Sequence, residues 1–163
     1  MDAELEVRLA ALEGRVRALE DMLAIQQIIA RYGPAVDSLS QAQVAALWAR
    51  DGVYDFGGEP LLGAEAVGKL VELSTHRAYV ERGCLHSLGN PVITIQGDHA
   101  VATGNSRVYV HEDDGWKVER AAANRWELVR DGEGWKVASR TNRLLDGTED
   151  ARLVLRSVDR PVK

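Results

Sequence analysis

Three residues of this sequence have side chains suited to acid–base chemistry at neutral pH: Tyr32, Asp37 and His86. A histidine has an ordinary pKa of about 6.5, so His86 could both accept and donate a proton. The carboxylate of Asp37 could orient such a histidine and stabilise its charged form. The Tyr32 hydroxyl could donate a hydrogen bond to a substrate oxygen. Each residue also has a purely structural alternative: a strand histidine, a helix-end carboxylate and a core tyrosine.

Polar residues inside the expected strands form a second group of candidates. Asparagine is disfavoured in strands, so Asn105 and Asn124 need hydrogen-bond partners or a role in a pocket. Arg140 could steady an oxyanion or a carboxylated substrate, and an exposed ion pair is an equal alternative. Four aromatic residues could form an apolar wall, with core packing as the alternative: Trp48, Tyr54, Phe56 and Trp126.

The other reactive side chains receive no role. His76, His99 and His111 are expected to be exposed or in turns, and Cys84 is expected to be a buried, inert thiol. A single cysteine excludes an internal disulfide. The sequence contains no CxxC, HExxH, GxGxxG or P-loop motif. It therefore predicts neither a metal ion nor an organic cofactor.

Composition narrows the class of partner. A net charge of −5 argues against nucleic acid, because phosphate binding requires clustered Lys and Arg. No apolar run approaches the roughly 20 residues that span a bilayer, and the acidic start of the sequence lacks the features of a signal peptide. We therefore expect a cytoplasmic protein whose partner is a small molecule.

The first stretch predicts a long helix with coiled-coil spacing. Its apolar residues recur at alternating intervals of four and three: Leu5, Leu9, Leu12, Val16, Leu19 and Leu23. This stripe could pack on its own domain or pair with a second subunit, and we expect a homo-oligomer, most simply a dimer. Residues 1–21 are treated as an extension of the domain. Gly33-Pro34 is expected to disturb the helix after Tyr32.

Two shorter helices are predicted before the strands begin. Ser40 and Gln43 have the spacing of a capping box, which predicts a second helix ending near Asp51-Gly52. A short strand is expected over residues 53–56. A third helix is expected over residues 64–80.

The second half of the chain predicts a run of strands. They cover residues 85–95, 100–111, 117–130 and 135–145, with Gly-Asp or Asp-Gly turn signals between them. Helices followed by antiparallel strands indicate an α+β domain with the helices on one face of a curved sheet. Such a sheet leaves a pocket at its open end. The polar tail, residues 147–163, is expected to be less ordered.

Several short motifs follow one another along the chain: Arg31-Tyr32, Asp37, residues 48–51, His86 with Asn90, Gly97-Asp98, and Gly134-Trp135 with Arg140. In this order, over residues 22–146, the sequence resembles the SnoaL-like branch of the nuclear transport factor 2-like superfamily. The resemblance implies a cone-shaped α+β domain, described as a cystatin-like α+β barrel. In such a domain three helices cover the concave face of a curved antiparallel sheet, and here the N-terminal helix is extended.

The resemblance also implies a chemistry. Enzymes of this superfamily, such as scytalone dehydratase, bile acid dehydratases and ketosteroid isomerase, generally need no metal or organic cofactor. Tyr32, Asp37 and His86 most resemble the dehydratase subgroup, although the following strand has no carboxylate before Glu112. The implied function is a lyase or isomerase, most simply a dehydratase, acting on a small cyclic or aromatic molecule. A hydrolase or polyketide-type cyclase using the same pocket, and a non-catalytic ligand-binding or assembly module, remain alternatives.

Overall fold

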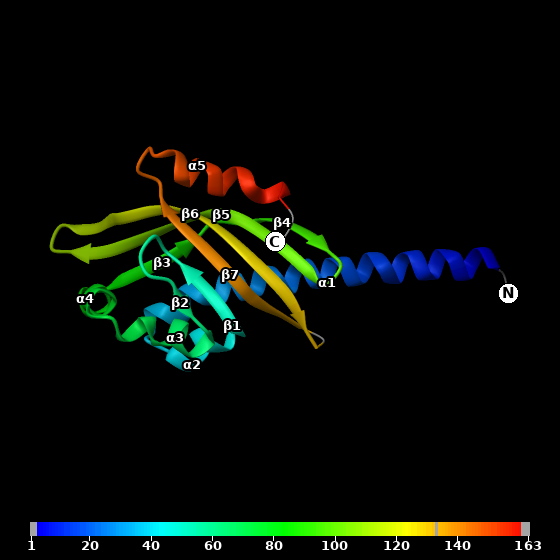
Figure 1. Cartoon of the computed structure of the whole chain (residues 1–163), viewed down its shortest axis with the longest axis horizontal. Helices are drawn as coiled ribbons and strands as arrows, with labels where there is room; N and C mark the ends of the chain where they lie inside the picture. The colour runs from blue at the N-terminus through cyan, green and yellow to red at the C-terminus, as the bar shows by residue number, and fades with distance from the viewer. Residues whose placement is uncertain (1–2, 133, 161–163) are drawn as a thin grey trace.

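A computed structural model describes residues 3–132 and 134–160 of the chain. Its longest element is helix α1 (Ala3–Asp37), which is rich in Ala, Leu, Glu and Arg, the residues with the highest helix propensity. Residues 3–20 project as an exposed arm, and fully buried positions begin at Ile25 (Figure 1). The first anchor to the sheet is Asp21, whose carboxylate accepts hydrogen bonds from Arg130 (2.8 and 2.9 Å) and from Trp135 Nε1 (2.8 Å). None of the helices in the described residues is both long enough and apolar enough to cross a bilayer.

The expectation that Gly33-Pro34 disturbs the first helix is wrong, because α1 continues through Pro34 to Asp37. The glycine is required by packing instead. A Cβ on Gly33 would collide with the carbonyl oxygen of His86, so its absence lets strand β3 (Cys84–Leu88) lie directly against the helix. Tyr32 and Asp37 therefore belong to one continuous element that contacts the strand carrying His86.

The segment after α1 is more broken than the sequence predicts. It contains α2 (Gln41–Ala46), β1 (Trp48–Asp55), β2 (Leu61–Leu62), α3 (Ala64–Gly68), the 3-10 turn η1 (Lys69–Glu72) and α4 (Ser74–Arg82). The second helix ends at Ala46, so residues 48–51 belong to a strand. Ser40 precedes α2 as expected, but its hydroxyl bonds to the Ser38 hydroxyl (2.9 Å) and forms no capping bond. The single helix expected over residues 64–80 is interrupted at Leu73, which has an extended backbone.

The described residues form one seven-stranded curved sheet. Besides β1, β2 and β3 it contains β4 (Val92–Gln96), β5 (His99–Glu112), β6 (Gly115–Asp131) and β7 (Gly134–Leu144). The strand order is β2-β1-β7-β6-β5-β3, and β4 also pairs with β5. The sheet is mixed rather than wholly antiparallel, because β1 runs parallel to β7. The strand expected over 85–95 is two strands, which pair with opposite ends of β5 on either side of Gly89.

The expected α+β class with a curved sheet is confirmed. The inner half of α1, together with α2, α3 and α4, covers the concave face (Figure 1). The core between these layers is apolar and aromatic and includes Ile25, Ile29, Tyr32, Trp48, Trp126, Leu128 and Val137. On the other face, α5 (Glu149–Leu155) packs against β6 and β7 and buries Ala151, and η2 (Arg156–Asp159) follows it. This helix corrects the expectation of a less ordered tail; residues 161–163 lie outside the described residues.

Candidate active site

Asp37 and His86 form a hydrogen-bonded pair where the end of α1 meets β3. The His86 Nδ1 and the Asp37 Oδ1 are 2.6 Å apart. The second carboxylate oxygen accepts the His86 backbone N–H at 2.8 Å, and the Cys84 thiol donates to Oδ1 at 3.2 Å. The expectation that these two residues lie within hydrogen-bond reach is confirmed. Because Asp37 accepts bonds from both the ring and the backbone of His86, the imidazole has little freedom to rotate.

The environment of Asp37 keeps its carboxylate ionised. Burial raises the pKa of Asp37, but the bonds from His86 and Cys84 outweigh burial and hold the pKa below its usual value. An ionised carboxylate can only accept, so the proton between the two groups belongs to His86 Nδ1. In the neutral imidazole this leaves the Nε2 lone pair available for a ligand proton.

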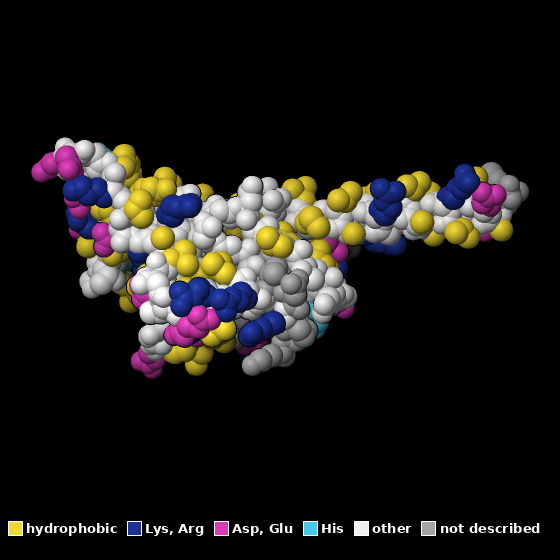
Figure 2. All heavy atoms as spheres, turned by 90° about the horizontal axis from the view of Figure 1, so that it is seen from above, with side chains coloured by type: hydrophobic (Ala, Val, Ile, Leu, Met, Phe, Trp, Pro, Cys, Tyr) yellow, Lys and Arg dark blue, Asp and Glu magenta, His cyan; other side chains and the backbone are white. Residues whose placement is uncertain are grey.

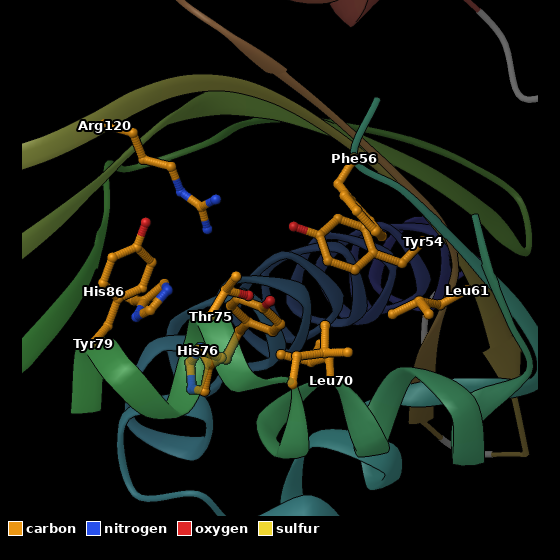
Figure 3. A pocket seen from close by; sticks show the side chains of 11 residues that line it. Tyr54, Phe56, Leu61, Leu70, Thr75, His76, Tyr79, His86 and Arg120 are labelled. Carbon is orange, nitrogen blue, oxygen red and sulfur yellow. The ribbon is translucent and has the colours of Figure 1, made fainter. Parts of the chain in front are cut away.

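The open side of His86 faces a cavity of about 120 Å³ (Figure 3). Its apolar lining consists of Phe56, Leu61, Leu70 and Leu73. Its polar and aromatic lining consists of Tyr32, Tyr54, Thr75, His76, Tyr79, His86 and Arg120. A cavity of about 150 Å³ is known to admit benzene, so this slightly smaller space, which is open at its mouth, suits a molecule no larger than a single ring.

Tyr32 lies at the base of the cavity, where its ring meets Trp126 and Tyr54 edge-on at 5.6 and 6.5 Å. Burial, reinforced by Tyr54, raises the pKa of the Tyr32 hydroxyl, whereas Arg140 opposes this rise. The phenol therefore remains protonated at neutral pH and is able to donate a hydrogen bond.

Arg140 is buried beneath the aromatic wall, so the alternative of an exposed ion pair is wrong. Its guanidinium carbon lies 4.1–4.7 Å from the ring centres of Tyr32, Tyr54 and Trp126. Nε and Nη2 donate to Asn124 Oδ1 at 3.1 and 2.7 Å, whereas Nη1 finds no partner among the described residues. Three ring faces and one amide thus hold a buried cation directly below the cavity.

The remaining predicted residues line the cavity, lie in the core behind it, or are exposed to solvent. Tyr54 and Phe56 line the cavity, and Trp48 and Trp126 lie in the core behind it. Asn124 is buried and holds Arg140. Asn105 is exposed and lies away from the cavity, which corrects the suggestion that it lines the pocket.

Sequence reasoning missed His76, which is buried rather than exposed. Its Nε2 bonds to the Val36 carbonyl oxygen at 2.8 Å, and its ring centre is 5.4 Å from that of His86. Burial lowers the pKa of His76, with the Val36 carbonyl opposing this, so the ring stays neutral and Nδ1 is an acceptor. Thr75 and Tyr79 were also missed; their i, i+4 spacing is the sequence signal that could have placed both on one helix face.

Asp37, Cys84 and His86 have the side-chain types of a metal site, and their potential ligand atoms lie within 4.8 Å of one another. Burial, reinforced by Asp37, raises the pKa of the Cys84 thiol to about 12, which keeps it protonated and a poor ligand. The three side chains are already bonded to each other. Their chemistry fits a hydrogen-bonded acid–base group better than a ligand set.

Comparison with known proteins identifies relatives of this fold. No protein of curated function matches the chain. An NTF2-like protein with a cystatin-like fold from Novosphingobium aromaticivorans is 39% identical, with a TM-score of 0.88, over 90% of this chain and 96% of that one. A structure from Catenulispora acidiphila is 25% identical (TM-score 0.66), with 90% of this chain and 97% of that one covered. The hexachlorocyclohexane dehydrochlorinase LinA-type3 from Novosphingobium barchaimii is 19% identical (TM-score 0.70), with coverages of 80% and 90%.

The family assignment agrees with the geometry and with the motifs along the chain. The SnoaL-like domain matches residues 17–141, which include both members of the Asp37–His86 pair and most of the sheet. This chain therefore belongs to the SnoaL-like domain family.

Proposed function

We propose that this protein is a cofactor-independent lyase or isomerase, most simply a dehydratase, acting on a small ring compound by proton transfer. The observation that carries the proposal is the Asp37–His86 pair, whose Nδ1–Oδ1 distance is 2.6 Å. The carboxylate holds the imidazole in the tautomer that a general base needs, and the His86 side chain, which is 9% exposed, lines a single-ring cavity.

The chemical step uses His86 as the base. The Nε2 lone pair removes a proton from a carbon next to a carbonyl group, and the C–H electrons move toward the carbonyl oxygen. Asp37 stabilises the imidazolium that forms. In an elimination the electrons then form a C=C bond and break the C–O bond at the neighbouring carbon. The departing hydroxyl takes a proton from the imidazolium and leaves as water. In an isomerisation the same proton returns to a different carbon.

The developing negative charge on the carbonyl oxygen needs stabilisation in a water-poor site. Tyr32 has a protonated hydroxyl at the cavity wall, and Arg140 is a buried cation directly beneath its ring, 4.3 Å from the ring centre. Both favour negative charge on a bound ligand. The neutral His76 can accept a hydrogen bond from a substrate hydroxyl through Nδ1.

A relative by fold performs an elimination on a ring, as its name states: hexachlorocyclohexane dehydrochlorinase. At 19% identity this likeness shows only the common fold. The proposal therefore depends on the side chains of this chain. The relative adds only that an elimination on a ring is compatible with this fold.

The test is proton exchange, which both a lyase and an isomerase must catalyse. A panel of six-membered ring ketones and β-hydroxy ketones is incubated with the protein in D₂O, and deuterium uptake next to the carbonyl is followed by NMR. His86→Ala should slow uptake by about 100-fold or more, the usual contribution of a positioned acid–base group. Asp37→Asn should slow it less, and Tyr32→Phe should slow it without unfolding the domain.

The matched control is His99→Ala, which removes an exposed histidine at the start of β5. It should leave uptake unchanged. Uptake that is the same in wild type and His86→Ala would contradict the proposed function and favour a ligand-binding module in the same fold.

A further inference from the structure

Arg120 reaches from β6 into the mouth of the cavity, opposite α4 (Figure 3). Its direction follows from the alternation of side chains along β6, because the register is continuous from the buried Trp126 to Arg120 and both occupy even positions. Arg120 pairs with the buried Val108, so both lie on the concave face of the sheet. The ladder is irregular only beyond this pair, where a β-bulge makes Glu119 an extra residue.

The lining formed by the described residues contains one arginine, Arg120, and no carboxylate. Arg120 has no hydrogen bond or ion pair with any other described residue, and the neighbouring Glu119 accepts the Tyr79 hydroxyl at 3.0 Å. Arg140 beneath the cavity is held by an amide and by ring faces rather than by a carboxylate. Two carboxylates lie next to lining residues, and both accept hydrogen bonds from them: Asp37 from His86 and Glu119 from Tyr79. Neither is bonded to Arg120, so this guanidinium has no counter-ion among the described residues.

We propose that Arg120 binds an anionic substituent of the substrate, most directly a carboxylate, and so selects ring acids over neutral ring compounds. A guanidinium presents two parallel N–H donors that match the two oxygens of a carboxylate. Arg120 lies at the exposed mouth, so it recognises and orients the ligand, whereas His86 acts at the reacting carbon. This inference rests on the proposed function, because it names the substrate class of the same cavity.

Calorimetric titration with benzoate and benzamide tests it without turnover, since the two probes have the same shape and differ in charge. Wild-type protein should bind benzoate more tightly than benzamide. Arg120→Gln should weaken benzoate binding by roughly ten- to a hundredfold, the usual range for one charge-assisted contact, and leave benzamide unaffected. Arg120→Lys should retain part of the preference. Arg107→Gln is the matched control, because Arg107 is an exposed arginine whose position in β5 is one residue out of phase with Val108.

Equal affinity for both probes, no measurable binding of benzoate, or a preference that survives Arg120→Gln would overturn the inference. His86→Ala should retain the benzoate preference. An intact preference with no His86-dependent proton exchange would therefore disprove the proposed catalysis and leave the anion site standing.

A separate observation concerns the arm, residues 3–20 of α1. Its apolar stripe consists of side chains that are each more than half exposed: Leu5, Leu9, Leu12, Val16, Leu19 and, just beyond the arm, Leu23. Exposed hydrophobic side chains are visible along the length of the arm (Figure 2). The domain does not cover this stripe, because the side chains of α1 that face the sheet, beginning at Ile25, lie on a different side of the helix. At 100° a residue, Leu23 and Ile25 point about 200° apart, toward nearly opposite sides of the helix.

The charged residues beside the stripe indicate what covers it. With Leu5, Leu12 and Leu19 at heptad position d, the g positions hold Arg8 and Arg15 and the e positions hold Glu6, Glu13 and Glu20. In a parallel pair of helices each g residue meets the e residue five positions later in the other helix. Arg8 then faces Glu13 of the second copy, and Arg15 faces Glu20. An antiparallel pair would instead place g against g and e against e, so like charges would meet.

The geometry points to a second copy of this chain as the occupant, with the two arms in a parallel two-stranded coiled coil. Arg8 bonds to Glu4 within the same helix at 2.6 Å, but both side chains are about 70% exposed, and such a pair contributes little. Arg8 can therefore exchange its bond to Glu4 for a bond to Glu13 of the second copy with little loss of free energy. Val at one a position and Leu at all d positions suit two strands.

Sedimentation equilibrium on full-length protein tests the pairing. Wild type should be dimeric at micromolar concentration. Arg8→Glu with Arg15→Glu should weaken the dimer by roughly tenfold or more, because four attractive contacts become repulsive. Adding Glu13→Arg and Glu20→Arg to this variant should restore the dimer. A monomeric wild type, or a dimer insensitive to the double reversal, would overturn the proposal.

Orientation is tested by Leu5→Cys. In a parallel pair the two cysteines meet at one d layer, so mild oxidation should cross-link the dimer. Wild type under the same oxidant controls for Cys84, which is half-buried in the domain. A dimer of Leu5→Cys that is not cross-linked would contradict the parallel arrangement.

Discussion

The two halves of α1 have the same backbone and the same apolar spacing, but opposite surroundings. Leu5, Leu9 and Leu12 in the arm follow intervals of four and three, and so do Ile25, Ile29 and Tyr32 in the inner half. The first set is exposed, whereas the second lies in the core under the sheet. Periodicity therefore identifies an apolar face of a helix without identifying what covers it. The inner half of α1 packs under the sheet and carries Tyr32 and Asp37, whereas the arm leaves its apolar face exposed to solvent.

The two glycines of α1 give the largest contrast between these halves. Gly33→Ala gains helix propensity but forces a Cβ into the His86 carbonyl oxygen. We expect a loss of about 1–3 kcal/mol in the free energy of unfolding. We also expect a loss of up to about 100-fold in proton exchange, because the strand carrying His86 must shift. Urea titration and the exchange assay measure the two effects, and unchanged values for both would show that α1 and β3 can separate without consequence.

Asp21, at the junction of the two halves, should give an intermediate effect. The hydrogen bond from Arg130 chiefly lowers the pKa of Asp21, with burial opposing and Trp135 contributing. A lowered pKa means that the carboxylate adds stability above its unfolded-state value of about 3.9, and that this stability is lost as the pH falls through the folded-state pKa. Asp21→Asn should therefore lower Tm at neutral pH.

The pH dependence sharpens that prediction. In Asp21→Asn the free energy of unfolding should depend less steeply on pH below about 4 than in wild type, because one proton-linked group has been removed. Gln26→Ala, which changes an exposed uncharged residue of the same helix, is the control and should leave the slope unchanged. A slope equal to that of wild type in Asp21→Asn would mean that the junction is not anchored by this carboxylate.

Gly14→Ala in the arm should have a small effect of opposite sign to Gly33→Ala. A Cβ on Gly14 meets nothing within 4 Å, and alanine exceeds glycine in helix propensity by up to about 1 kcal/mol. The helix content of the arm, measured by circular dichroism, should rise slightly without weakening the dimer. A weaker dimer would place Gly14 in the interface and contradict the heptad register proposed above.

Metal removal should have the smallest effect of all. Among the described residues, the one group of side chains suited to a metal is Asp37, Cys84 and His86. The Cys84 thiol is protonated and Asp37 already accepts hydrogen bonds, so neither is available as a metal ligand. Proton exchange should therefore be unchanged by EDTA. Loss of exchange that one added metal restores would replace the acid–base interpretation with a metal site.

The sequence predicted local structure well where local physics decides it. The Gly97-Asp98, Asp114-Gly115 and Asp131-Gly132 signals all mark turns between consecutive strands, with Gly115 and Asp131 as the terminal residues of β6. Turns are predictable in this way because they depend on a few neighbouring residues. Local rules failed at Pro34 and over residues 64–80. At Pro34 the packing of α1 on β3 overrides the tendency of proline to end a helix. Over residues 64–80 the expected helix is interrupted at Leu73, whose extended backbone separates η1 from α4.

The site followed a similar division. The order of motifs along the chain sufficed to select Asp37 and His86, and the structure brings them within 2.6 Å. Local reasoning expected His76 to be exposed or in a turn and made Asn105 a secondary candidate for the pocket, although the first is buried and the second exposed. No local pattern distinguishes a buried histidine on a short helix from an exposed one. The helix had to be placed against the Val36 carbonyl first.

The sequence alone therefore determined the α+β class, the pair of residues that we propose for proton transfer and the apolar stripe of the arm, because spacing and residue chemistry are properties of the chain. Tertiary structure alone decided which face of β6 meets the cavity, because alternation along a strand separates its two faces without showing which one the helices cover. It alone decided that Arg140 is a buried cation and that the arm leaves the domain at Asp21. These outcomes depend on how distant segments pack together, and packing is a property of the whole fold rather than of any window of residues.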